Sequence, residues 1–232
     1  MATAAVKKLK SKTPKVPIAE QAYAELKRRI LENELPTGHQ LMEGEVADLL
    51  EISRTPAREA MMRLETEGLV EVRPRHGMKV KPVSVSDMKE IYALLTGLES
   101  TAAWQAAMRD HTDEEIQALR DSVDQMDEAL KAQDLDAWAN ADATFHRLLV
   151  EMSGNQRLIE LVSRFIDQSH RVRKLTLRLR PMPAQSNEDH SNVVDAIVAK
   201  NAEEARRIHR IHREKAGFLL VELLESHGLT QL

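Results

Sequence analysis

The hydrophobic period of the sequence changes at Gly68, and this change narrows the possible folds more than any other feature. Before it, apolar residues recur every three or four positions, as they do along the buried face of a helix. After it come two short, valine-containing runs, Leu69–Arg73 and Met78–Pro82, separated by a Pro-Arg-His-Gly segment. In the first run valine alternates with charged residues, which is the period of a half-buried strand. The two runs therefore predict a small β-hairpin that follows a helical segment.

Three helices are predicted ahead of this hairpin. The first has apolar residues at helical spacing over Ile18–Leu35, and Pro36 ends it. The second is short and covers Glu43–Leu50, and the third covers Ser53–Leu69. Three helices and a hairpin are the outline of a winged helix-turn-helix domain, which we place at residues 18–83.

From Ser86 onward the sequence is helical in character, and we assign residues 84–232 to a second domain. Breaks divide it into about six helices of roughly 15 to 25 residues each, which favours an antiparallel bundle. These breaks fall near Asp110–Thr112, Gln133–Asp134, Gly154, the Pro181 and Pro183 pair, and Asn201. The predicted fold class is mainly α: an N-terminal winged helix-turn-helix with a small β-hairpin wing, and a C-terminal all-α antiparallel bundle.

The composition excludes several classes of function. Hydrophobic residues make up 42% of the chain, enough for a substantial core. The absence of cysteine excludes disulfides, thiolate nucleophiles and thiolate metal ligands. No apolar run is long enough to span a bilayer, and no apolar signal-peptide core follows the N-terminus. We therefore expect a cytoplasmic protein without a membrane partner.

The charge is distributed unevenly along the chain. Residues 1–82 hold 15 Lys and Arg against 12 Asp and Glu, whereas the remainder holds 18 against 25. Residues 1–17 contain five lysines and no acid, which predicts a disordered basic tail. A mildly basic N-terminal part joined to an acidic C-terminal part is typical of a protein that binds a polyanion through its N-terminal part. Ordinary scatter in surface charge is an equally good reading of these numbers.

The segment Ser53–Leu69 has the pattern of a helix that reads DNA. One face is apolar and is expected to pack on the preceding helices: Ala57, Met61 and Leu64. Arg54 and Arg58, four residues apart, share another face with Thr55 beside them. A guanidinium fork in the first turns of such a helix can bond guanine O6 and N7 or hold a phosphate.

The proposed wing adds Arg75 and His76 at its tip, where a hairpin reaches the adjacent groove or backbone. Gly77 permits the positive backbone angle that such a turn often needs. The alternative is that the two helix arginines belong to a solvated face and pair with Glu51 or Glu65.

A third arginine on the same helix, Arg63, lies away from that face. We expect it to pair with Glu59 or Glu67, four residues on either side, rather than to contact DNA.

Four residues of the second domain form a candidate metal site. Asp142 and His146 are four apart on one helix and project from the same face. His190 and His212 lie on later helices, and His209 is an alternative to His212. One carboxylate and three imidazoles can hold a divalent transition metal. By spacing alone, such histidines are more often surface or satisfied core residues.

Three motifs in the N-terminal part resemble the winged helix-turn-helix of GntR-type bacterial regulators: Leu41–Ala47, Ser53–Ala60 and Leu64–Val70. In that family the arginines matching Arg54 and Arg58, and the wing region matching Gly77, contact double-stranded operator DNA. The resemblance therefore implies the same roles here. One position departs from the family, because Gly44 replaces a frequent DNA-contacting arginine; this is expected to change the operator preference.

Residues 87–215 resemble the FCD ligand-binding domain of FadR-type GntR regulators. The resemblance rests on Phe145-His146, Gly154-Asn155 and the segment from His190 to Ile197. In metal-binding members the four ligands correspond to Asp142, His146, His190 and His212, and this register selects His212 over His209. Zinc would be satisfied by four protein ligands, whereas nickel or manganese would keep positions open for water or a carboxylate.

Organic acids are common effectors in the subfamily that the sequence resembles. Many members have an arginine near the start of the first helix of this domain, where this chain has Leu95. If that arginine binds a carboxylate, the effector is held differently here. Arg171 and Arg173 are possible substitutes, and the alternative for both is a solvated or ion-paired face.

The sequence thus predicts a homodimeric transcriptional regulator that reads a pseudo-palindromic operator and responds to a small carboxylate effector. A metal-responsive regulator without an organic effector is the first alternative. A helical metalloenzyme that uses the same four residues is the second. Against an enzyme, no general base is identifiable and no Glu-x-x-His motif occurs, so we expect no catalytic activity.

Overall fold

The computed structural model describes residues 16–229, and the predicted basic tail lies outside them except for its last two residues. The N-terminal part is a compact unit of helices with a three-stranded sheet. Its elements are α1 (Ile18–Leu31), β1 (Gln40–Leu41), α2 (Glu43–Leu49), α3 (Arg54–Thr66), β2 (Val70–Arg73) and β3 (Gly77–Val80). The second part is helical apart from its loops. Its elements are α4 (Val85–Met108), α5 (Asp113–Lys131), α6 (Leu135–Met152), α7 (Gln156–Leu175), the short 3₁₀ helix η1 (Leu177–Leu179), α8 (Ala184–Val198) and α9 (Ala202–Ser226).

The predicted fold class is confirmed, with a third strand added to the wing. β2 and β3 form the predicted antiparallel hairpin, in which Arg73 is opposite Gly77 and Val70 is opposite Val80. β1 pairs with the other edge of β3, so the strand order is β1-β3-β2. Two residues are too few to carry a hydrophobic period, which explains why β1 escapes a sequence-based prediction.

The first helix is shorter than predicted, because it ends at Leu31 rather than near Leu35. Asn33 adopts the left-handed conformation, with φ of 64°, and the chain turns back there. The backbone N–H of Leu35 then donates to the carbonyl of Arg29, and the Leu35 side chain folds into the core. The apolar residue at 35 therefore belongs to the turn and not to the helix.

Most helices of the bundle begin with a local side-chain cap. In α4 the Ser84 hydroxyl accepts from the backbone N–H of Asp87, and Thr112 does the same for Glu115 in α5. Asp134, Asn155 and Asn201 cap α6, α7 and α9 in the same way, whereas α8 begins after Pro183 without a side-chain cap. These polar residues are the signal that made the breaks visible in the sequence.

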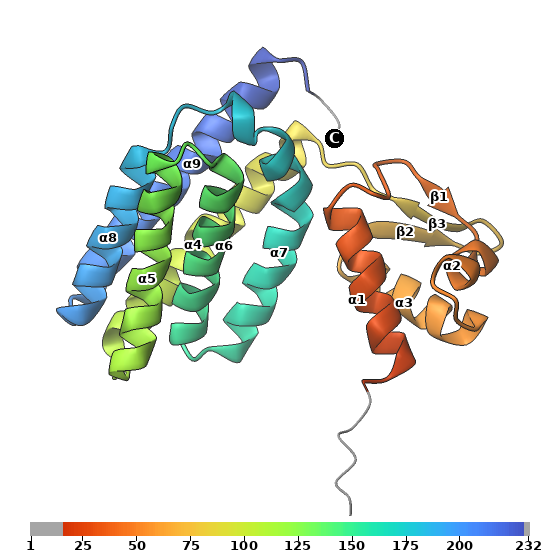
Figure 1. Cartoon of the computed structure of the whole chain (residues 1–232), viewed down its shortest axis with the longest axis horizontal. Coiled ribbons are helices and arrows are strands. Elements are labelled where there is room, and N and C mark those ends of the chain that lie inside the picture. The colour runs from red at the N-terminus through yellow and green to blue at the C-terminus, as the bar shows by residue number, and fades with distance from the viewer. Residues whose placement is uncertain (1–15, 230–232) are drawn as a thin grey trace, which may run out of the picture.

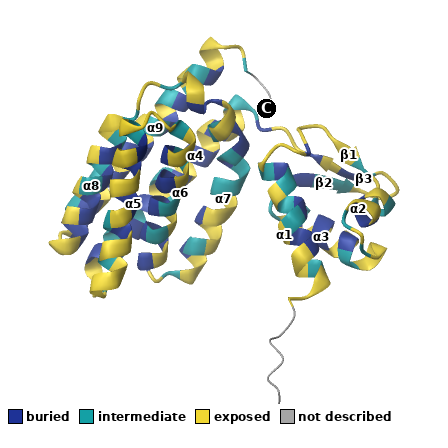
Figure 2. Cartoon of the chain, viewed as in Figure 1, coloured by how far each residue is buried: buried dark blue, intermediate teal, exposed yellow. Residues whose placement is uncertain are grey.

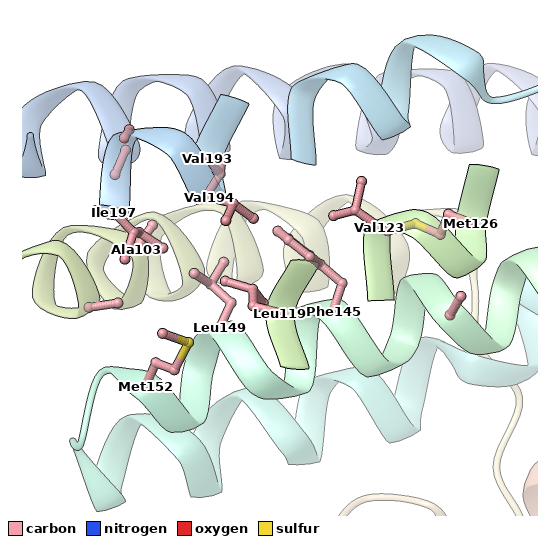
Figure 3. Packing of buried hydrophobic residues seen from close by; sticks show 14 of the residues in the cluster. Ala103, Leu119, Val123, Met126, Phe145, Leu149, Met152, Val193, Val194 and Ile197 are labelled. Atoms are coloured by element: carbon pink, nitrogen blue, oxygen red, sulfur yellow. The ribbon is translucent and has the colours of Figure 1, made fainter. Parts of the chain in front are cut away.

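The bundle is held together by an apolar core between its helices. Figure 3 shows Leu119 of α5, Phe145 of α6 and Val193 of α8 among the side chains that meet there. A second cluster joins α4, α7 and α9, and a third fills the N-terminal unit. Figure 2 shows buried positions facing inward along each helix, and exposed positions facing outward. Within the described residues, no helix combines the length and the apolar character needed to cross a bilayer.

The helix α7 lies between the two parts of the molecule. Figure 1 shows it on the side of the bundle that faces α1, and the two helices are in contact. On α7, Gln168 donates to the carbonyl of Glu67 and Asp167 forms an ion pair with Lys27 at 2.5 Å. The same helix also reaches the interior of the bundle, as described below.

Candidate DNA-binding face and metal centre

The helix α3 separates an apolar face from an arginine face. Ala57, Met61 and Leu64 are buried against the N-terminal core. Arg54, Thr55 and Arg58 are exposed and lie in the first two turns of the helix. This arrangement leaves the arginine face available to a large partner.

The alternative of an ion-paired arginine face receives no support from the contacts. Within residues 16–229, neither Arg54 nor Arg58 forms an ion pair with an acid. Glu65 instead accepts a 2.7 Å hydrogen bond from the backbone N–H of Val72, which ties α3 to β2. The two guanidinium groups are therefore not committed to partners in this part of the chain.

Arg63 has a structural role at the other end of α3. Its guanidinium lies 3.5 Å from the centre of the Tyr23 ring and 2.5 Å from a carboxylate oxygen of Glu20. The expected pairing with Glu67 is present at 3.7 Å, whereas none with Glu59 is formed. Arg63 therefore fastens α3 to α1.

Gly44 lies directly beside the arginine face. A side chain added at this position would be 3.5 Å from a terminal nitrogen of Arg54. The departure from the usual arginine thus falls next to a predicted DNA-reading residue, where it alters the surface that DNA would meet.

The wing places Arg75 and His76 at an exposed tip. The turn is closed by a 3.0 Å hydrogen bond from the backbone N–H of His76 to the carbonyl of Arg73. Gly77 has φ of 72°, and a Cβ there would lie 2.0 Å from the carbonyl oxygen of Leu41. Gly77 is therefore required by the backbone, so its presence alone does not demonstrate a DNA contact.

We expect Gly77→Ala to destabilise the protein by more than the roughly 1–2 kcal/mol that a left-handed backbone costs a residue with a Cβ. The added methyl would also collide with the backbone of β1. Chemical denaturation measures the effect. Gly97→Ala is the matched control, because a Cβ there meets nothing within 4 Å on the helix α4. Equal stability of the two variants would show that the wing does not need this close approach.

The predicted metal residues converge inside the bundle. Nitrogens of His146, His190 and His212 all lie within 4.8 Å of one another, although the residues come from α6, α8 and α9. The Oδ1 atom of Asp142 lies 3.5 Å from Nε2 of His146 and 3.8 Å from Nε2 of His190. Tetrahedral ligands bound at about 2.0–2.1 Å from a zinc ion are about 3.4 Å apart, close to these separations.

The burial of these residues is unusual for polar groups. Asp142, His146, His190 and His212 are all at most 5% exposed. Among the described residues, neither ring nitrogen of His146 or His190 has a hydrogen-bond partner. Buried polar atoms without partners are costly, and they are rare unless a ligand or water satisfies them. The donor set therefore fits a transition metal.

The protonation states of His190, His212 and Asp142 suit metal binding as well. Burial lowers the pKa of His190 well below its ordinary value and also lowers that of His212. Burial alone raises the pKa of Asp142, but His146 and Arg173 reverse the effect and lower it well below the usual range. Neutral imidazoles and an ionised carboxylate are the forms that bind metals.

Arg173 and Asp142 form a buried ion pair. A terminal nitrogen of Arg173 lies 2.7 Å from Oδ2 of Asp142, the oxygen that does not face His146 and His190. The carboxylate thus has one oxygen held by α7 and one directed at the imidazoles. Of the two arginines that the sequence analysis proposed for the effector, Arg171 and Arg173, it is Arg173 that forms an ion pair with Asp142.

A neighbouring group contains residues that the sequence analysis did not select. Glu99 on α4 and His209 and Arg213 on α9 are fully buried or nearly so beside His146. Burial raises the pKa of Glu99, but the charges of Arg213 and His146 lower it well below its usual value. Burial also lowers the pKa of His209 to about 3. One feature of the sequence could have indicated a buried role for Glu99: it is the only charged residue between Glu90 and Arg109.

Comparisons with known proteins identify the family. The model of the bacterial regulatory proteins of the gntR family matches residues 18–80, and the FCD domain model matches residues 90–215, more than half of the chain. The chain belongs to the GntR family. Its FCD domain contains the candidate metal residues, and its gntR segment contains the predicted DNA-reading residues.

Relatives of this GntR-family protein are transcriptional regulators. An HTH-type regulator from the TAR-I ttuE-ttuC' intergenic region of Agrobacterium vitis is 41% identical over 56% of this chain and 77% of its own length. The HTH-type transcriptional repressor RspR of Escherichia coli is 25% identical over 87% of this chain and 88% of its own. This GntR-family protein is therefore a DNA-binding transcriptional regulator and not an enzyme.

Solved structures agree with the fold. Escherichia coli McbR/YncC aligns with a TM-score of 0.74 at 21% identity, covering 90% of this chain and 99% of that one. A GntR regulator from Rhodococcus aligns with a TM-score of 0.69 at 21% identity, covering 88% and 97%. At this identity the likeness concerns the fold alone.

A cavity of about 210 Å³ opens beside the candidate metal residues in the GntR-family protein. Asp142, His146 and His212 are among its lining residues, together with further charged groups such as Asp189 and Lys215. Its apolar lining residues include Leu135, Trp138, Leu177, Pro181, Met182, Pro183 and Leu219. A small cavity that combines apolar surface with polar groups is typical of a small-molecule site.

The structure brings only one of the two predicted effector arginines to this cavity. Arg173 lines it, whereas Arg171 faces the N-terminal part of the regulator and is not among its lining residues. The Arg171 guanidinium donates to the carbonyl of Lys81 at 2.6 Å and to the hydroxyl of Thr37 at 3.1 Å. Leu95, at the position of the missing family arginine, is fully buried in the apolar core.

The cavity contains a further arginine that the sequence analysis did not select. This residue is Arg180, which follows η1. Among residues 16–229, no carboxylate lies within ion-pair distance of its guanidinium. Among the described residues its guanidinium donates to the hydroxyl of Thr176 at 3.0 Å and to the carbonyl of Arg173 at 3.5 Å, and its buried Nε has no partner. It is thus a cation with unused hydrogen-bonding capacity.

Proposed function

We propose that this transcriptional regulator holds a divalent transition metal ion with Asp142, His146, His190 and His212. One observation carries the proposal: buried imidazole nitrogens without partners converge with an ionised carboxylate oxygen. An ion there would satisfy these atoms and supply a Lewis-acidic position for an oxygen ligand. Because the cavity borders the site, we favour an ion with open positions, nickel or manganese, over a closed zinc site.

We further propose that the effector is a small carboxylate that binds in the adjoining cavity. Arg180 supports this assignment, because its charge has no acidic partner among the described residues. A guanidinium fork binds a carboxylate through two parallel hydrogen bonds. In this arrangement Arg180 takes the place of the family arginine that Leu95 has replaced, while Arg173 holds Asp142.

Arg180→Met should weaken the binding of the effector by about 10-fold or more, the typical value of a charged hydrogen bond in a buried site. The metal affinity should be unchanged, because Arg180 forms no hydrogen bond with any of the four proposed metal ligands. A thermal-shift screen of the metal-loaded protein with small mono-, di- and tricarboxylates measures both properties. Arg178→Met, an exposed arginine nearby, is the control. Equal responses of the two variants would remove Arg180 from the site.

The DNA-binding domain is assigned to residues 18–83 and the effector and dimerisation domain to residues 84–232. Arg54, Thr55 and Arg58 would enter the major groove, while Arg75, His76 and the Gly77 turn would reach the neighbouring groove or backbone. Two copies related by a two-fold axis would read the halves of a pseudo-palindrome. Because a bacterial regulator meets its operator DNA inside the cell, the protein is expected to act in the cytoplasm.

We propose that α7 carries the signal between the two domains. One of its faces contacts the metal ligand Asp142 through Arg173. The other contacts the DNA-binding domain through Arg171 and Gln168, and Lys174 also pairs with Glu32. A ligand that changes the position of Asp142 would therefore shift the preferred placement of the DNA-binding domain. Such a shift couples the free energy of effector binding to that of DNA binding, which is allostery.

Arg171→Met should uncouple the two functions. We expect normal metal and effector binding, but at least half of the effector's influence on DNA affinity should be lost. The measurement compares anisotropy titrations of promoter DNA from upstream of the protein's own gene, with and without the effector found in the screen. Arg157→Met, on an exposed position of the same helix, controls for charge. A full effector response in Arg171→Met would exclude this route.

The alternative function, a metal-responsive regulator without an organic effector, makes a different prediction. Metal would then change the DNA affinity by itself, and no carboxylate in the panel would raise the melting temperature of the loaded protein. The same thermal-shift and anisotropy measurements therefore separate the two functions.

A further inference from the structure

A second polar cluster lies behind the candidate metal site. The carboxylate of Glu99, on α4, receives Nε of Arg213 at 2.9 Å and Nε2 of His209 at 3.1 Å. A second nitrogen of Arg213 binds its other oxygen. Nδ1 of His146 lies 2.9 Å from the same Oε2 atom. Glu99 is thus at the centre of a fully buried network that touches one metal ligand.

This network does not have the chemistry of a second metal site, although Glu99, His146 and His209 offer atoms within 4.8 Å of one another. Both oxygens of Glu99 are already bound by the guanidinium of Arg213. A metal ion would have to displace this buried cation or lie beside it, and either arrangement costs electrostatic free energy.

The two nitrogens of His146 face different groups. Nε2 faces Oδ1 of Asp142, on the side of the proposed ion, and Nδ1 faces Glu99. A histidine that binds a metal through Nε2 carries its proton on Nδ1, and the buried N–H then needs an acceptor. The Nδ1–Oε2 separation of 2.9 Å suits such a bond, although the ring orientation is not the ideal one for it.

We infer that Glu99 is the positioning residue of the metal centre: it accepts the Nδ1 proton of His146 and so presents Nε2 to the ion. This inference rests on the proposed metal site. Arg213 and His209 hold the Glu99 carboxylate in place, and Arg213 balances its charge inside the bundle.

The test measures Zn²⁺ binding to the full chain by competition with a chelator, together with the tautomer of His146 by nitrogen-detected NMR. In the double variant Glu99→Gln/Arg213→Gln, which removes both buried charges, the Zn²⁺ affinity should fall by about 10- to 100-fold, as is typical of lost outer partners. The wild-type zinc complex should show His146 protonated at Nδ1. Asp195→Asn, an exposed carboxylate on α8, is the control and should bind Zn²⁺ normally.

Glu99→Asp provides a second test that keeps the charge of Arg213 paired. It withdraws the acceptor by one methylene group, so the affinity should again fall, and circular dichroism will report whether the helices are intact. Wild-type affinity in a folded Glu99 variant, or two Zn²⁺ ions per wild-type chain, would overturn the role of Glu99. Failure of the wild-type chain to bind any ion would instead contradict the metal site itself.

Discussion

Replacing Arg58 with alanine is expected to weaken specific operator binding by about 1–3 kcal/mol, which is roughly a 5- to 150-fold increase in Kd. The exposed guanidinium has no ion-pair partner among residues 16–229, so its loss should leave the fold intact. A bidentate contact to guanine would make the loss specific to one base position. Anisotropy titrations with operator DNA and with base-substituted operators measure both effects.

The matched control is Arg63→Ala, on the same helix but fastened to α1. It removes the same charge, so it corrects for the general attraction of DNA to a basic protein. Its effect should be on stability and should be nearly uniform across DNA sequences. If Arg63→Ala lost as much operator specificity as Arg58→Ala, the assignment of the reading face would be wrong.

Replacing His190 with leucine is expected to abolish metal binding and yet to leave the metal-free protein as stable or more stable. The first result follows because a ligand is lost, which should cost more than the roughly 10- to 100-fold typical of an outer partner. The second follows because both ring nitrogens of His190 are buried without a partner among the described residues. Leucine removes this cost and still packs against Phe145, whose ring centre is 4.2 Å from that of His190.

Thermal unfolding with and without metal separates these effects. The wild-type protein should gain stability with metal, by about 4 kcal/mol when the free ion is at 1,000 times its Kd. The variant should gain none, while its metal-free melting temperature should be equal or higher. A large loss of stability in the metal-free variant would show instead that His190 is a packing residue.

The parts of the fold that could be predicted are those with local signals. Cap residues such as Ser84 and Thr112 are read from a few neighbouring positions, and the hairpin follows from its two-residue period. The end of α1 was misplaced because Leu35 fits the helical period but packs from a turn after Asn33. Periodicity cannot distinguish these two ways of burying the same side chain.

Two parts of the candidate site could be predicted: residues that lie close together on one helix, and residues that match a family pattern. Asp142 and His146 share one helical face, but their meeting with His190 and His212 depends on how separate helices pack. The pairing of Glu99 with Arg213 spans 114 positions, and no short-range pattern reveals it. Arg171 and Arg173 are two positions apart on one helix and so point in nearly opposite directions, about 200° apart. The sequence could not decide which of them faces the bundle.

The most direct test of the metal-centre proposal is elemental analysis of the full chain, purified from metal-supplemented culture and separated from free ions. Wild-type protein should retain one divalent transition metal ion per chain, and His190→Leu should retain close to none. An absence of metal from the wild-type chain, or an equal content in both, would contradict a metal centre at Asp142, His146, His190 and His212.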